Sequence, residues 1–358
     1  MPAIPTRFIP RLRSPARPWA RPSVSVPSEL TTVPGIRRDV AAEDEAYARQ
    51  PLHFFFVLHA EVRSVLFEHL AATFLTVAPR LFSATRRLKE AQNREPVTCP
   101  REDVDPHALT AELKAEASRL GVSAAGVARL DPRYTFAEYA GLAVGDRVLV
   151  CVLEQNYHAT QRIPSLRSEQ AALSAYGELE DRMVALAEWL RARGYRARPE
   201  TFEGESLVIH YAVAAGLGQL GMNGQLLTPQ AGSRCRLNVL TTDAPLELDE
   251  PVDYGLEGVC DKCQICVRRC PVGAIPNQRK EYRGITKAKL NTKRCLPILM
   301  QTEGCSICMK VCPVQRYGLD AVLEEYERSG AILGKGSDDL EGYDWPLDAR
   351  HYGPGQKP

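Results

Sequence analysis

Apolar and polar positions follow a regular order in the middle of the chain. Residues 108–121 place apolar side chains at helical spacing, and a longer helix is predicted from about 165 to 194. Three apolar runs suit strands, at 122–130, 146–153 and 236–243. Because strands and helices alternate, the pattern predicts an α/β fold with an open sheet and helices packed on it.

The N-terminal part of the chain has a different composition. Residues 1–38 hold seven arginines, eight prolines and one acidic residue, which cannot bury a core. We therefore expect a disordered leader over residues 1–50. Arg37 and Arg38 are adjacent, but an acidic stretch follows them where a twin-arginine export signal needs an apolar segment.

An apolar segment follows the leader, at residues 53–82. Glu61, Arg63 and Glu68 interrupt it, so it offers no uncharged span to a bilayer. We expect one or two docking helices in a helical extension over residues 51–105, and no membrane partner.

Length and charge limit the classes of function. The 358 residues suffice for two or three domains and for a core that can bury a cofactor. Lys and Arg number 45 against 44 Asp and Glu, a formal charge of +1. This balance lacks the basic footprint that nucleic-acid binding usually needs, so no nucleic-acid partner is predicted.

The cysteines carry the strongest chemical signal. Eight of the eleven lie between residues 260 and 312, at spacings that suit metal binding better than disulfides and predict a reducing, cytoplasmic location. The run CDKCQICVRRCPVGAI, residues 260–275, has the complete C-x2-C-x2-C-x3-C-P spacing of a bacterial ferredoxin. It predicts a ferredoxin-like module with iron-sulfur clusters.

A second run, GCSICMKVCP at residues 304–313, has three cysteines, because Thr302 stands where the first cysteine of the motif belongs. In two-cluster ferredoxins the fourth cysteine of each run ligates the other cluster. The first predicted [4Fe-4S] cluster is therefore held by Cys260, Cys263, Cys266 and Cys312. The second is held by Cys270, Cys305, Cys308 and one further ligand.

Loop reach favours Cys295 as the further ligand, since nine residues separate it from Cys305. Cys99, Cys151 and Cys235 are the other cysteine candidates, and a [3Fe-4S] cluster or a non-cysteine ligand are further alternatives. Cys99 and Cys151 are better explained as small buried hydrophobes.

The segment AAGLGQLGMNG contains a G-x-G-x-x-G match at Gly216, Gly218 and Gly221. A dinucleotide fingerprint follows a strand and opens a helix, whereas residues 210–215 before this match are predicted to be helical. The glycines are therefore expected to mark a close approach of backbone to a ligand or to another element.

The stretch GLGQLGMNGQLLTPQAGSRCRLNVLTTDAPL, followed by the two cysteine runs, resembles the cobalamin-dependent reductive dehalogenases, with epoxyqueuosine reductases as more distant relatives. The resemblance covers about residues 108 to 316. It implies an α/β domain, related to vitamin B12-processing proteins, that holds a base-off corrinoid beside one of two [4Fe-4S] clusters. The implied function is reductive removal of halide from an organohalide. The corrinoid contacts expected in this stretch are Gly216, Gly218, Gly221, Asn223 and Gly224.

The resemblance also implies a proton donor and a basic partner. The donor maps to Tyr176, which shares one helical stripe with Ala172, Leu179, Met183, Leu186 and Leu190. A buried structural tyrosine would give the same pattern. The basic partner maps to Arg236, whose charge beside a phenol would ease proton delivery. Arg234, two residues away, could take that role or bind a cofactor carboxamide or phosphate.

Two departures from the family bear on function. Some members carry an asparagine where Glu203 stands nearest, which puts the substrate in doubt. Respiratory members have an export leader and a membrane anchor, which we do not find, so a cytoplasmic enzyme is expected. Its partners would be a small-molecule substrate and an external electron donor such as ferredoxin, flavodoxin or a reductase.

Two alternatives stay open: an epoxyqueuosine-reductase-like corrinoid reductase of a non-halogenated substrate, and a ferredoxin-like electron-transfer protein without corrinoid. The predicted organisation is a leader (1–50), a helical extension (51–105), a corrinoid-binding α/β domain (106–250), a ferredoxin-type domain (251–320) and a C-terminal packing tail (321–358).

Overall fold

The computed structural model describes residues 77–97, 104–136, 139, 141–202, 204–282, 285–291, 294–295, 298–299 and 302–358. The predicted leader, Cys99, Glu203 and most of the apolar segment at 53–82 lie outside these residues. Among the helices that the structure describes, none is both long and apolar enough to cross a bilayer.

A four-stranded sheet with the order β1-β2-β6-β3 forms the centre of the α/β part, and its neighbouring strands are all antiparallel. Its strands are β1 (Ala124–Arg129), β2 (Arg147–Glu154), β3 (Ala197–Pro199) and β6 (Cys235–Thr242). The three predicted strands are present. The fourth strand, β3, has three residues, too few to show a period of two in the sequence.

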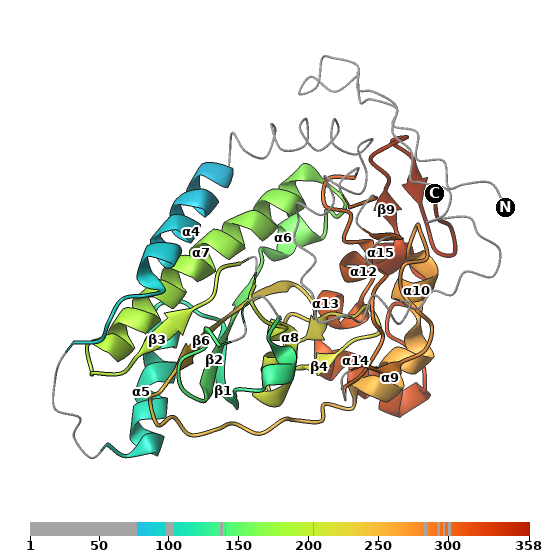
Figure 1. The fold of residues 1–358 in the computed structure, drawn as a ribbon. Coiled ribbons are helices and arrows are strands. Elements are labelled where there is room, and N and C mark those ends of the chain that lie inside the picture. The colour runs from blue at the N-terminus through green and yellow to red at the C-terminus, as the bar shows by residue number, and fades with distance from the viewer. Residues whose placement is uncertain are drawn as a thin grey trace.

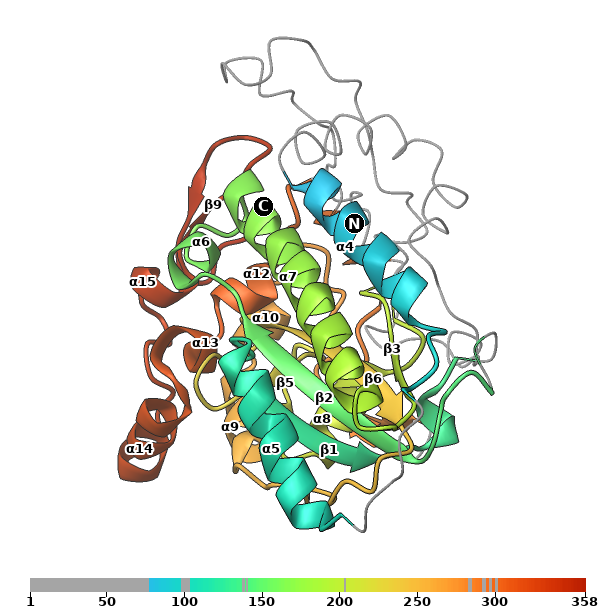
Figure 2. The same cartoon turned by 90° about the vertical axis from the view of Figure 1, so that its left-hand side faces the viewer.

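Helices cover both faces of this sheet, which is why the apolar run of β2 has no polar alternation. Leu149 and Cys151 face a core shared with the helices α4 (Ala78–Ala91), α5 (Pro106–Arg119) and α7 (Leu166–Arg191). Val148 and Val150 face the other way, toward α8 (Val208–Ala214). Figure 1 shows α4 and α7 on one side of the sheet and α8 on the other, and Figure 2 shows α4 alongside α7.

The long helix α7 begins at a capping box, in which the Ser165 hydroxyl accepts the Ser168 N–H. Four members of the predicted stripe, Leu179, Met183, Leu186 and Leu190, have no exposed surface, and Ala172 is also buried. Tyr176 lies at the edge of this stripe and is half-buried. Its ring therefore reaches the border of the core, and does not lie within it as the stripe predicted.

The remaining elements of the α/β part are η2 (Pro132–Tyr134), α6 (Tyr157–Thr160), β4 (Gln219–Leu220) and β5 (Leu226–Leu227). The cysteine module that follows contains α9 (Leu256–Cys263), α10 (Ile265–Arg269), β7 (Lys280–Tyr282), β8 (Ile285–Lys287), α12 (Ile307–Lys310), α13 (Pro313–Tyr317) and α14 (Leu319–Ser329). It is drawn in orange and red in Figure 1, beside the sheet.

One hydrophobic core joins the cysteine module to the α/β part. Ile163, Met222 and Leu227 of the α/β part are buried in the same cluster as Cys263, Cys270 and Cys312. The C-terminal segment contains α15 (Asp338–Glu341), β9 (Tyr343–Asp344) and β10 (His351–Tyr352). It adds the buried side chains of Tyr343 and Trp345 to this cluster. The cysteines therefore lie at a packed junction: Cys263, Cys270 and Cys312 are buried in it, and the other five pack against it and are partly exposed.

Candidate iron-sulfur and catalytic site

The first cysteine group consists of Cys260, Cys263, Cys266 and Cys312. Burial raises the pKa of the Cys266 thiol well above its usual range; the other three members of the group raise it further, and so does Cys308. Such mutual effects require the sulfur atoms to lie close together. Gln264, at φ 54°, turns the chain between α9 and α10 so that cysteines from both helices face one site. This group is the ligand set predicted for the first cluster.

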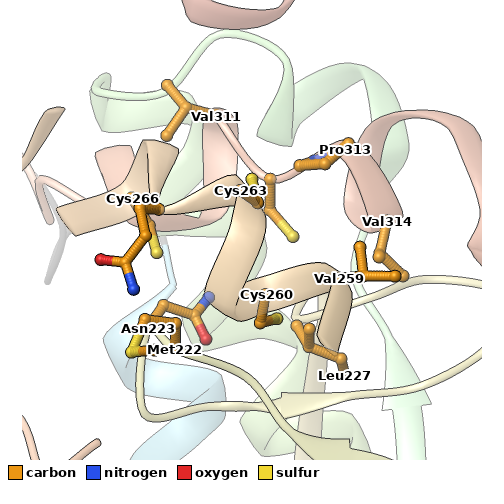
Figure 3. A pocket seen from close by; sticks show the side chains of 12 residues that line it. Met222, Asn223, Leu227, Val259, Cys260, Cys263, Cys266, Val311, Pro313 and Val314 are labelled. Atoms are coloured by element: carbon orange, nitrogen blue, oxygen red, sulfur yellow. The ribbon is translucent and has the colours of Figure 1, made fainter. Parts of the chain in front are cut away.

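A small cavity opens between the first cysteine group and the α/β part (Figure 3). Met222 and Asn223 line it opposite Cys260, and the Met222 N–H donates to the Cys260 sulfur. Further backbone N–H groups donate to Cys263 and to Cys312. Because backbone donors favour the thiolate over the thiol, this lining suits negatively charged sulfur.

The second cysteine group consists of Cys270, Cys295, Cys305 and Cys308. Burial raises the pKa of Cys295 well above its usual range, and the other three members raise it further. The backbone N–H of Ala274 donates to Cys270 Sγ at 3.2 Å. The structure therefore brings Cys295 to the three cysteines that lacked a fourth partner.

Both groups have the features expected of cubane sites. Burial raises the pKa of Cys263 to about 11 and of Cys305 to about 12, so the thiols stay protonated until metal displaces the protons. Among the described residues, no group of three His, Cys, Asp or Glu side chains is arranged to hold a metal ion.

Two further cysteines lie away from these groups. Cys151 has no exposed surface, and burial alone raises its pKa to about 12. Burial also raises the pKa of Cys235 to about 11, and the charges that act on it belong to Arg236, Glu154 and Arg234. Neither sulfur is affected by another cysteine, so both behave as small buried side chains and not as ligands.

The two residues predicted for proton delivery are in contact. The guanidinium carbon of Arg236 lies 5.0 Å from the centroid of the Tyr176 ring. The amide of Gln155, in the orientation that satisfies its hydrogen bonds, accepts from Arg236 Nε at 3.0 Å and Nη2 at 2.8 Å. Phe202 packs on the tyrosine ring with centroids 5.4 Å apart.

The Tyr176 hydroxyl makes no hydrogen bond to any residue that the structure describes. The side chain is half-buried, so one end of the ring is fixed while the hydroxyl is left to other partners. A structural tyrosine in a core normally pairs its hydroxyl. This arrangement suits a phenol that meets a ligand.

Arg234 occupies a different place from Arg236, although the sequence put both on one strand face. It precedes β6, and its guanidinium lies over the ring of Tyr157 at 5.4 Å. Its Nη1 donates to the Gln155 carbonyl at 2.7 Å and to the Glu154 carboxylate at 3.2 Å. Of the two arginines, Arg236 is therefore the one that contacts Tyr176.

The segments that carry Tyr176 and Arg236 touch residues next to the cysteine groups. The Glu303 carboxylate accepts the N–H of Leu166 at the start of α7 at 2.9 Å, and Gly304 lies against Glu169. Tyr176 follows Glu169 by seven residues, about 10 Å along the helix. On the other side, Gly232 packs against the backbone of Gln315, three residues after Cys312.

The predicted corrinoid contacts have structural roles of their own. A Cβ at Gly216 would meet the Glu250 carbonyl, and one at Gly218 or Gly221 would meet Leu227. Gly224 has φ +73° and approaches the Ala288 carbonyl. These glycines make room for the chain itself, which is the second of the two explanations that the sequence offered. Helix α8 precedes the match, so the context of a dinucleotide fingerprint is lacking.

Sequence reasoning missed Gln155 and Phe202. The position of Gln155 near Arg236 could be predicted only once the β2–β6 register was known, in which Leu153 lies opposite Arg236. Asn223 was expected to contact the corrinoid. The structure places it at the first cysteine group, with its side-chain oxygen accepting the Gln225 N–H at 3.2 Å.

Comparisons with known proteins agree with this site. Residues 259–316 match the 4Fe-4S dicluster domain family. A tetrachloroethene reductive dehalogenase from Sulfurospirillum multivorans is 26% identical over 259 residues, which cover 60% of this chain and 52% of that protein. An epoxyqueuosine reductase from Lactococcus garvieae (strain Lg2) is 33% identical over 138 residues, which cover 34% of this chain and 35% of that protein.

A solved reductive dehalogenase, whose structure suggests a mechanism for B12-dependent dehalogenation, has the same fold. It matches with a TM-score of 0.63 at 23% identity, over 75% of this chain and 44% of that chain. This chain thus spans about half the length, or less, of the relatives that it matches.

The chain accordingly contains a segment that matches the 4Fe-4S dicluster domain, within a mixed α/β architecture. It is related by sequence to reductive dehalogenases and epoxyqueuosine reductases, which are oxidoreductases. The resemblance and the fold class predicted from the sequence are confirmed.

Proposed function

We propose that this protein is an iron-sulfur and cobalamin-dependent oxidoreductase that removes halide from an organohalide, with Tyr176 as the proton donor. The observation that carries the proposal is the Tyr176–Arg236 contact at 5.0 Å, in a chain that also brings together two groups of four cysteines. The homologous tetrachloroethene reductive dehalogenase supports the substrate class.

The reaction replaces a carbon–halogen bond by a carbon–hydrogen bond. It consumes two electrons and one proton and releases one halide ion. An external donor supplies the electrons, and the two cysteine groups would hold [4Fe-4S] clusters that supply one-electron chemistry. The Tyr176 hydroxyl gives its proton to the carbon that the halide leaves, and the Arg236 cation stabilises the resulting phenolate.

Arg234 supplies an observation that fits cobalamin. Its Nε is buried and has no hydrogen-bond partner among the residues that the structure describes. A buried donor without an acceptor is costly, and the carboxamides and phosphate of cobalamin are acceptors. We therefore assign Arg234 to cobalamin binding. Bound cobalamin would supply the reductant that breaks the carbon–halogen bond.

The test is anaerobic reconstitution of the full chain with iron, sulfide and cobalamin. We expect about eight irons, near-stoichiometric base-off cobalamin and halide release from a panel of bromo- and chlorophenols with a strong reductant. The cobalamin spectrum and halide assay are read separately, so that binding and turnover are distinguished.

Two outcomes would replace the proposal. Full cluster content without cobalamin uptake would favour an electron-transfer protein. Cobalamin uptake without halide release from any tested compound would favour reduction of a non-halogenated substrate. The second outcome would be followed by an assay for epoxyqueuosine reduction, because an epoxyqueuosine reductase is among the relatives.

A further inference from the structure

Tyr343, on β9, has a buried hydroxyl that the proposed reaction does not use. The side chain is 3% exposed, and its hydroxyl has no hydrogen-bond partner among the described residues. A buried hydroxyl without an acceptor destabilises a fold, because it has given up its hydrogen bond to water. Its ring is nevertheless held in place on several sides, so the position of the hydroxyl is fixed by packing.

Arg269 and Tyr352 fix this ring. The guanidinium carbon of Arg269 lies 4.7 Å from the centroid of the Tyr343 ring, and the Tyr352 ring stacks on it at 6.1 Å. Arg269 is 2% exposed, and its Nη2 donates to the carbonyls of Glu341 at 2.8 Å and Tyr352 at 3.0 Å. These bonds hold the C-terminal hairpin against α10, which leads directly to Cys270.

Tyr343 shares its hydrophobic cluster with the second cysteine group. Tyr343 is buried in one hydrophobic cluster with Cys270, and Cys295, Cys305 and Cys308 pack against that cluster. Burial raises the pKa of Tyr343 far above its usual range; Arg269 opposes this, and Cys305 and Cys270 add to it. The Tyr343 ring thus lies over Arg269, the residue directly before Cys270, and shares a hydrophobic cluster with that cysteine. Sulfur bound to iron carries negative charge and accepts hydrogen bonds.

We propose that Tyr343 donates a hydrogen bond to a sulfur atom of the second cluster and thereby raises the reduction potential of that cluster. The inference rests on the assignment of Cys270, Cys295, Cys305 and Cys308 as its ligands. An added electron increases the negative charge on the sulfur atoms, so the hydrogen bond is stronger in the reduced state. Hydrogen bonds to sulfur are among the factors that set iron-sulfur potentials.

The test compares Tyr343→Phe with Tyr352→Phe in an EPR-monitored redox titration of the reconstituted protein. Tyr352 stacks on the same ring, but its hydroxyl donates to Asp348 at 2.7 Å, so it serves as the matched control. In Tyr343→Phe we expect the ratio of reduced to oxidised second cluster, at a fixed applied potential, to fall by about tenfold, which is 59 mV for a one-electron couple. The first cluster and the control should keep their potentials.

A second variant guards against a loss of the cluster on substitution. Fluorotyrosine at position 343 keeps the ring and the hydroxyl but makes the hydroxyl a stronger donor, so the second cluster should shift to higher potential. Unchanged potentials in both Tyr343 variants, or equal shifts in Tyr352→Phe, would overturn the proposal. Failure of the ligand assignment would be visible separately, as a wild-type protein without two cluster signals.

Discussion

The guanidinium of Arg236 lies over the ring of Tyr176, 5.0 Å from its centroid. Gln155 binds the far edge of the same guanidinium, so the arginine is fixed between an amide and a phenol ring. A cation over an aromatic ring is attracted by the ring's negative face, which stabilises this arrangement without using the hydroxyl. The pair is therefore oriented while the hydroxyl keeps its proton available.

Replacement of the Tyr176 hydroxyl should separate catalysis from stability. In Tyr176→Phe we expect halide release to fall by about a hundredfold or more, because the proton donor is lost. The free energy of unfolding should change by less than about 0.5 kcal/mol, since no described residue binds this hydroxyl. Iron, cobalamin and turnover are measured on the same preparation.

Tyr157→Phe is the matched control, because Tyr157 also lies beside an arginine but its hydroxyl accepts from Arg316 Nη1 at 2.5 Å. It should lose stability and keep its turnover rate. Equal halide release by wild type and Tyr176→Phe on every reactive compound would show that Tyr176 has a structural role only.

The two arginines near the start of β6 should have opposite phenotypes. Arg236→Ala should bind cobalamin normally and lose about tenfold to a hundredfold in turnover, because the cation beside the phenol is removed. Arg234→Ala should lose cobalamin and stability, since Arg234 binds the Gln155 carbonyl at 2.7 Å and carries a buried unpaired Nε. Cobalamin content and single-turnover rates are measured for both variants; loss of cobalamin in Arg236→Ala with retention in Arg234→Ala would reverse the two assignments.

Cys295→Ala should damage one cluster and spare the other. Cys295 lies with Cys270, Cys305 and Cys308, and its removal leaves three thiolates, enough at most for a [3Fe-4S] cluster. Iron content should fall below about eight per chain, and the EPR signal of the first cluster should remain. Cys235→Ala is the control, because no other cysteine affects Cys235. Two intact [4Fe-4S] signals in Cys295→Ala would show that the fourth ligand lies elsewhere.

Glu200 makes stability depend on pH. Burial raises its pKa from 4.5 to about 7, although the Glu205 N–H and the Ser206 hydroxyl, both donating at 3.0 Å, and the Arg198 charge oppose this. The folded state therefore holds a proton that the unfolded state lacks between about pH 4.5 and 7, so stability falls as pH rises through this window.

Glu200→Gln should abolish that fall. An amide oxygen can still accept both hydrogen bonds, and the variant should exceed wild type by up to about 3 kcal/mol above pH 7 and match it near pH 4.5. Urea unfolding at pH 5 and pH 8 measures the difference, with the exposed Glu327→Gln as control. A constant difference between Glu200→Gln and wild type at both pH values would contradict the assignment.

The sequence by itself determined the iron-sulfur chemistry. The spacing of Cys260, Cys263, Cys266 and Cys270 is a local property, because one turn and the following helix set where these thiolates point. The main strands and helices were also readable, since their apolar side chains recur at the period of the element that buries them. Loop reach favoured Cys295 over the other candidates, because nine residues of chain can span only a limited distance.

Only the tertiary structure decided which side chains meet across the fold. The β2–β6 register places Leu153 opposite Arg236, and so brings Gln155 to the arginine that covers Tyr176. The same register and the packing of α6 direct Arg234 to Tyr157. Strand pairing and helix packing depend on contacts between residues far apart in the chain, which periodicity does not encode. The C-terminal hairpin brings Tyr343 into the hydrophobic cluster of the second cysteine group. For that reason its unpaired hydroxyl could not be predicted from the sequence.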